Sequence, residues 1–161
     1  MFFVINKLLI FLFIFFANSC SLSEKNIIKN DNVNLISIET PNDKHNILFK
    51  VHLDRNFQTN KDISAKFFLK SNLSFKTSNT LSSGSSNYLK KTIGIVNYKL
   101  YDLNTNKLIK SGMLSSFPII GSTSNSLYSN EVGIKHSKER LNTLLSLKLY
   151  NHINVILRSL N

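Results

Sequence analysis

Apolar and polar positions alternate with two different periods along the chain, and the change of period marks the predicted elements. Residues 64–76 alternate at every second position, which predicts a strand with one wet face. Its apolar face carries Phe67, Leu69, Leu73 and Phe75, and its polar face carries Lys66, Lys70, Asn72, Ser74 and Lys76. Residues 127–160 instead repeat apolar side chains every three or four positions, which predicts a long amphipathic helix. Its stripe comprises Leu141, Leu145, Leu149, Ile153, Ile156 and Leu160, joined by Val132, Leu144 and Leu157.

Shorter patterns predict the elements before the long helix. Residues 33–40 predict a buried strand that Pro41 ends. Asn42 or Asp43 is placed to cap a following helix. The apolar side of that helix is expected to comprise Ile47, Leu48, Val51, Leu53 and Phe57.

Two further strands follow, over residues 88–102 and 107–117, and a turn at 102–106 predicts that they form a hairpin. In the first of these strands, Val96, Tyr98 and Leu100 are predicted to point to one side. The polar stretches 77–87 and 121–126 are predicted to be loops. The resulting order is strand, helix, three strands, helix. It predicts an α+β fold, a two-layer sandwich in which a four-stranded mixed sheet is covered by two helices.

The N-terminal residues have the order of an export signal. Lys7 precedes the apolar run 8–16, and small or polar residues 17–19 lead to Cys20, the only cysteine of the chain. A spanning helix needs about 20 apolar residues, so a cleaved signal is favoured over an uncleaved anchor. We expect Cys20 to be lipidated and to become the mature N-terminus; a chance cysteine after an ordinary export signal is the alternative.

This interpretation divides the chain into a signal peptide (1–19), the lipidated cysteine with a polar tether (20–32) and one α+β domain (33–161). Cleavage leaves 142 residues, enough for one domain with a sizeable core. It removes Lys7 alone among the charged side chains, so the net charge falls from +11 to +10. This excess favours a polyanionic partner such as anionic lipid or lipopolysaccharide. The chain has no run of basic residues that would indicate nucleic-acid binding.

One segment resembles a known family. Residues 98–112 match a "Y-x-L-Y-D-x-x-T-x-K-x-I-x-S-G" hairpin, and residues 126–129 give an "S-L-Y-S" entry to the last helix. In this the chain resembles the lipopolysaccharide-assembly lipoproteins of the LptE family. Relatives often continue from the lipidated cysteine with "C-G-F-x-P-L-Y", whereas this chain has Ser21-Leu22-Ser23. The resemblance therefore leaves the role of the tether open.

The resemblance implies a protein anchored by lipid to the periplasmic side of the outer membrane. Such proteins plug and help to assemble the β-barrel LptD, and they bind lipopolysaccharide; no catalysis and no cofactor are implied. The alternative is a lipid-anchored accessory subunit of an envelope ABC transporter, or another periplasmic binding lipoprotein.

Chemistry alone nominates a few site residues. Lys76, Lys90 and Lys91 flank the Ser-rich loop and could donate charge-assisted hydrogen bonds to lipid A phosphates, although solvated lysines are the simpler interpretation. Tyr128, at the entry of the last helix, is a candidate partner contact or a core residue. The four histidines lack metal-ligand spacing, and no catalytic motif is present, so neither a metal site nor an enzyme is expected.

Overall fold

The computed structural model describes residues 35–59, 64–81, 88–121 and 127–160. Its elements follow the predicted order, with one short strand added. They are β1 (Ile36–Glu39), α2 (Lys44–Phe57), β2 (Phe67–Leu81), β3 (Tyr88–Asp102), β4 (Lys107–Ser115), β5 (Ile119–Gly121) and α3 (Leu127–Arg158). The predicted signal peptide and tether, including Cys20, lie outside the described residues.

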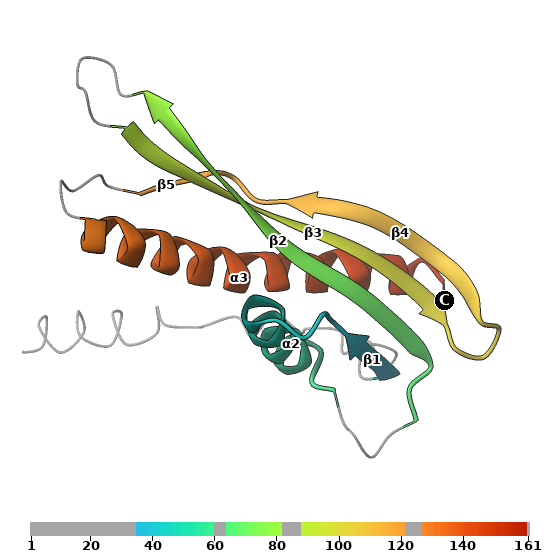
Figure 1. Cartoon of the computed structure of the whole chain (residues 1–161). Coiled ribbons are helices and arrows are strands. Elements are labelled where there is room, and N and C mark those ends of the chain that lie inside the picture. The colour runs from blue at the N-terminus through green and yellow to red at the C-terminus, as the bar shows by residue number, and fades with distance from the viewer. Residues whose placement is uncertain (1–34, 60–63, 82–87, 122–126, 161) are drawn as a thin grey trace, which may run out of the picture.

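The strands form one mixed sheet, and both helices lie against the same face of it (Figure 1). The strand order is β1-β2-β3-β4, with β1 parallel to β2 and the other neighbours antiparallel. This confirms the predicted two-layer α+β fold. β5 is the added fifth strand, which pairs with β3 at residues 90–92. Its three-residue length, directly after Pro118, left no alternation by which it could be predicted.

The core fills the space between the sheet and the two helices. Its fully or almost fully buried members are Leu69, Leu73, Val96, Tyr98 and Leu100 from the sheet, Phe49, Leu53 and Phe57 from α2, and Leu145, Leu149, Ile153 and Leu157 from α3. Each such side chain contributes about 1.5–3 kcal/mol through burial. The faces predicted for β2, β3 and most of α3 are confirmed, but Leu144 and Leu160 are exposed rather than part of the stripe, and Leu160 lies beyond the end of α3.

α2 begins where the sequence predicted, but it turns a different side to the core. Asp43 is the N-cap, and its Oδ1 accepts hydrogen bonds from the backbone N–H groups of His45 (3.0 Å) and Asn46 (3.1 Å). The predicted apolar side was wrong in part, because Ile47, Leu48 and Val51 are exposed. The buried positions are Asn46, Phe49, Leu53 and Phe57. Their spacing of three or four residues is equally helical, and the large aromatic rings take the core side.

β2 is longer than predicted. The Ser/Thr-rich residues after Lys76 were assigned to a loop, yet the strand continues to Leu81 and pairs with β3 down to the Leu81–Tyr88 pair. The prediction was wrong there because β3 supplies a partner for every one of these residues. Thr77 faces Thr92 across the ladder, with their hydroxyl oxygens 3.4 Å apart. β-branched polar residues suit such a strand well.

A glycine lets α3 approach the sheet closely. A Cβ built on Gly94 in β3 would lie 2.5 Å from Leu145 Cδ1 of α3 and 3.4 Å from the Phe75 ring. A larger residue at this position would force the Leu145 side chain, or α3 itself, to move. The absence of a side chain on Gly94 therefore gives Leu145 its space against the sheet.

Candidate functional site

The second face of the sheet carries no helix from the part of the chain that the structure describes, and we call it the open face. Because paired residues of neighbouring strands point to the same side, the strand register defines its rows. The rows are Phe68–Tyr101–Leu108, Glu39–Lys70–Lys99–Ser111, Asn72–Asn97–Met113, Ser74–Ile95–Ser115, Lys76–Ile93 and Ser78–Lys91–Ile120. The open face thus combines four lysines with several apolar side chains.

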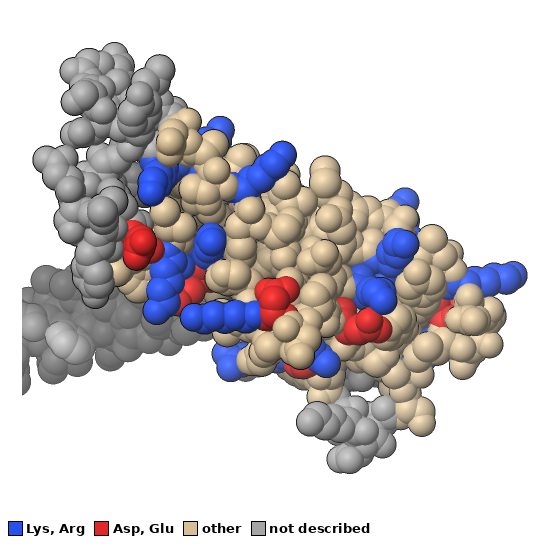
Figure 2. All heavy atoms as spheres, viewed as in Figure 1, with Lys and Arg blue, Asp and Glu red and all other residues tan. Residues whose placement is uncertain are grey.

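The positive charges of the open-face lysines are not matched by an equal number of acidic side chains on this face. Glu39 forms an ion pair with Lys70 (Nζ–Oε1 3.0 Å), and both side chains are more than half exposed. Such a pair contributes little to stability, so it leaves Lys70 available to a ligand. Lys76, Lys91 and Lys99 form no ion pair with a described acidic residue. In Figure 2, Lys and Arg reach the upper, sheet-side outline of the molecule, whereas Asp and Glu lie lower.

A hollow of about 690 Å³ crosses the open face from the end of β1 to Ser111 of β4. Glu39, Lys70, Asn72, Asn97, Lys99 and Tyr101 contribute to its lining. Lys70 and Lys99 were not among the lysines nominated from the sequence. The signal was present, since each occupies a polar position between two buried residues of its strand.

Below this hollow, Tyr98 connects the sheet to α3. Its hydroxyl lies 2.7 Å from His152 Nε2, and the two rings meet edge to face. Burial raises the pKa of the Tyr98 phenol. A Cβ on Gly112 of β4 would lie 2.8 Å from the same hydroxyl oxygen, so the small residue makes room for the phenol. This arrangement fixes the floor of the hollow from the core side.

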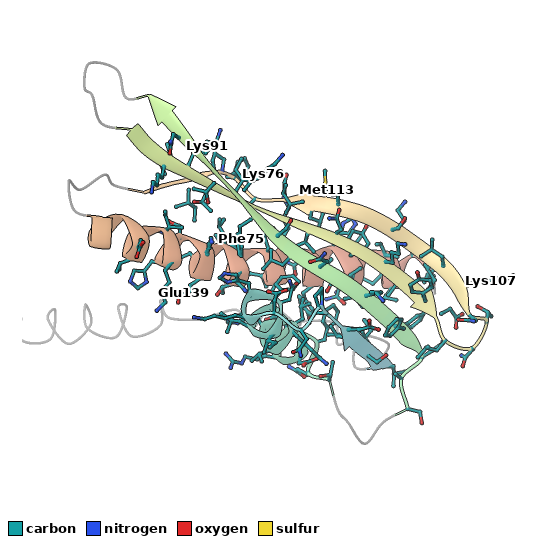
Figure 3. The ribbon with its side chains drawn as sticks, in the orientation of Figure 1. Phe75, Lys76, Lys91, Lys107, Met113 and Glu139 are labelled. Carbon is teal, nitrogen blue, oxygen red and sulfur yellow. The ribbon has the colours of Figure 1, made fainter. Side chains whose placement is uncertain are left out.

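The three lysines nominated from the sequence do not all lie on the same face of the sheet. Lys76 and Lys91 project from the open face, away from the helices, as does Met113, whereas Phe75 points toward α2 and α3 (Figure 3). Lys90 pairs with Asn79 and therefore belongs to the helix-covered side of the sheet. A single ligand on the open face would be reached by Lys76 and Lys91 rather than by Lys90.

The other nominated residues are less informative. Tyr128 lies in the first turn of α3, and its side chain falls outside the described part of the chain, as does Cys20. Within the described ranges, His, Cys, Asp and Glu form no group that could hold a metal ion. Nor is any described helix long and apolar enough to cross a membrane.

Comparisons with known proteins identify the fold. No family model matches the chain, and no curated protein is significantly similar to it in sequence. Solved structures are similar, however. A lipoprotein from Caulobacter crescentus CB15 superposes with a TM-score of 0.63 at 12% identity, covering 81% of this chain and 96% of that one. Rare lipoprotein B from Shewanella oneidensis gives 0.59 at 12% identity, covering 78% and 97%.

A third structure agrees with these two. The minor lipoprotein from Acinetobacter baumannii superposes with a TM-score of 0.51 at 18% identity, covering 74% of this chain and 91% of that one. The chain thus has a fold that occurs in bacterial lipoproteins, over almost the whole length of each of them.

Proposed function

We propose that this protein is a lipid-anchored component of the outer-membrane lipopolysaccharide translocon, which binds lipopolysaccharide on the open face of its sheet and assembles with an LptD-like β-barrel. The observation that carries the proposal is the open face itself. Four lysines share it with exposed apolar side chains, including Met113, which is 65% exposed.

Lipopolysaccharide suits such a surface chemically. Its lipid A part combines phosphate groups with acyl chains, so it calls for cations and apolar side chains side by side. Ammonium groups donate charge-assisted hydrogen bonds to phosphate oxygens. The two lysine groups, Lys70 with Lys99 and Lys76 with Lys91, are about six residues apart along β2, or roughly 20 Å at 3.3–3.4 Å per residue. Ile93, Ile95 and Met113 lie between these groups.

Two further observations support a place in the translocon. The motif of residues 98–112 resembles the LptE family, and the structure forms it as the β3–β4 hairpin. Asp102 Oδ1 accepts a hydrogen bond from the Asn104 N–H (2.8 Å) in the turn, and Asn106 adopts a left-handed conformation there. The fold is also that of several bacterial lipoproteins. An outer-membrane location, on the periplasmic side, belongs to the same proposal.

A pull-down from the native envelope tests the partner. The tagged full-length protein is extracted in mild detergent, and the proteins that remain bound are identified. We expect a large outer-membrane β-barrel protein in stoichiometric amount, and its loss when the hairpin motif is disrupted by Asp102→Pro. Recovery of an inner-membrane transporter complex instead would overturn the proposal in favour of an accessory subunit.

A further inference from the structure

The outer edge of β2 has partners over only part of its length. β1 pairs with β2 from Phe67 to Lys70. Beyond it, the buried Asn46 side chain acts as a strand would: its Nδ2 donates to the Leu73 carbonyl oxygen (3.0 Å), and its Oδ1 accepts from the Leu73 N–H (2.7 Å). β1 and the Asn46 side chain therefore lie one after the other along the same edge of β2, where a neighbouring strand would lie.

The Leu73 hydrogen bonds show which other β2 residues direct their backbone N–H and C=O groups to this edge. In an antiparallel ladder, every second residue directs both its N–H and its C=O to the same side. Gly94, the β3 partner of Phe75, agrees with this pattern, because it bonds to Ser116 on its far side instead. Every second residue of β2 has the same backbone orientation as Leu73. Phe75, Thr77 and Asn79 therefore direct their N–H and C=O groups away from β3. No described residue pairs with them there.

The two edges of the sheet differ in how they are protected against pairing with a strand of another chain. On the opposite edge, β4 carries Lys107 and Lys110, and its register with β3 shifts between Leu100 and Tyr101. Charges and bulges of this kind prevent unwanted pairing of an edge strand. From Phe75 to Asn79, by contrast, the register of β2 with β3 is regular and only Lys76 is charged.

Charge indicates what this edge accepts. Lys76 projects from the open face, and Lys138 Nζ lies 5.8 Å from the centroid of the half-buried Phe75 ring on the helix side. Neither lysine is paired with a described acidic residue. A second copy of this edge is disfavoured, since self-pairing would bring two Lys76 side chains onto one face. An acidic strand would meet a cation on either face.

We propose that the β2 edge from Phe75 to Asn79 binds an extended segment of another polypeptide by strand addition, and that this segment alternates acidic with apolar residues. Its acidic side chains face Lys76, and its apolar side chains contact the Phe75 ring. Its backbone pairs with β2 beyond the part of the edge that β1 and Asn46 occupy. Main-chain hydrogen bonds supply affinity in such complexes, and alternate side chains supply specificity. This edge site shares Lys76 with the proposed lipopolysaccharide surface, but its backbone groups and the Phe75 ring lie outside that surface.

The test uses the full mature chain and a defined probe, a hexapeptide of alternating Glu and Val with blocked ends. At about 1 mM peptide, we expect amide hydrogen exchange of Thr77 and Asn79 to slow roughly tenfold or more. Lys76 and Ser78 should change little, because their N–H groups already point to β3. A peptide with proline at alternate positions is the backbone control.

Charge reversal gives a second, independent measurement on a folded variant. Lys76 is exposed, so Lys76→Glu should leave the fold intact; it should abolish protection by the Glu–Val peptide and create protection by a Lys–Val peptide. Unchanged exchange at Thr77 and Asn79 with the Glu–Val peptide would overturn the proposal. So would equal protection by the proline peptide, or a Lys76→Glu variant that kept the original preference.

Discussion

The two faces of the sheet obey different rules although the same strands build them. On the helix-covered face, residues such as Leu69, Val96 and Leu100 are fully buried, and volume and shape determine what is allowed. On the open face, Lys70, Asn97 and Met113 are placed by the strand register and remain exposed. The covered face therefore determines the fold, while the open face is free to be specialised for binding.

The largest expected difference between the faces comes from truncating one side chain on each. Leu149 in α3 is fully buried, so Leu149→Ala should lower the free energy of unfolding by about 2–5 kcal/mol. Met113→Ala on the open face should change it by less than about 0.5 kcal/mol. Urea unfolding of both variants measures this. Similar losses would show that the open face is covered by part of the protein itself.

The glycines offer a sharper version of the same comparison. Gly94→Ala places a Cβ 2.5 Å from Leu145 Cδ1, and we expect it to destabilise the fold by about 1–3 kcal/mol. Gly133→Ala in α3 is the matched control, because nothing lies within 4 Å of its Cβ position. Higher helix propensity should make that variant more stable by about 0.5–1 kcal/mol. Thermal unfolding of both variants would reveal any deviation from these opposite signs.

Tyr98 tests the contact between the covered face and α3. Tyr98→Phe removes the hydrogen bond to His152 and should cost about 0.5–1.5 kcal/mol near neutral pH. Because burial raises the pKa of the phenol, the folded state holds this proton more tightly than the unfolded state. The wild type should therefore lose stability as the pH rises above 10.0, the ordinary pKa of tyrosine, and the Phe variant should lose less. Parallel pH slopes for the two proteins would contradict this.

His52 should give the smallest effect. Burial, and next the Arg55 charge, lower its pKa, so the folded state resists its protonation. The stability it contributes is present above pH 6.5, its ordinary pKa, and is lost as the pH falls through the lower folded value. His52→Gln should flatten this acid-side slope of stability against pH. A slope unchanged by the substitution would exclude His52 as its source.

The sequence predicted the fold class and the faces of β2 and β3, because alternation is a local property that burial imposes residue by residue. It misplaced Ile47 and Val51, since two apolar stripes on α2 have helical spacing and only the packed partner selects the one with Phe49. It ended β2 at Lys76 because Thr and Ser carry little apolar signal, and the pairing with β3 is a long-range contact.

The candidate site was less accessible to sequence reasoning. Lys76, Lys90 and Lys91 flank the same loop, and only the register of β2 with β3 separates Lys90 from the other two. The hydrogen bond of Tyr98 to His152 joins residues 54 positions apart. The Asn46–Leu73 bonds likewise depend on how α2 sits beside β2. None of these contacts leaves a local pattern in the chain.

The most direct test of the central claim is lipopolysaccharide affinity, measured by titration of the full mature chain in detergent. Lys76→Glu with Lys91→Glu reverses two charges on the open face. Lys44→Glu with Lys90→Glu reverses the same number elsewhere. We predict that the first variant binds about tenfold or more weakly, a loss of about 1.4 kcal/mol, and that the second stays close to wild type. Equal affinities of the two variants would contradict the account.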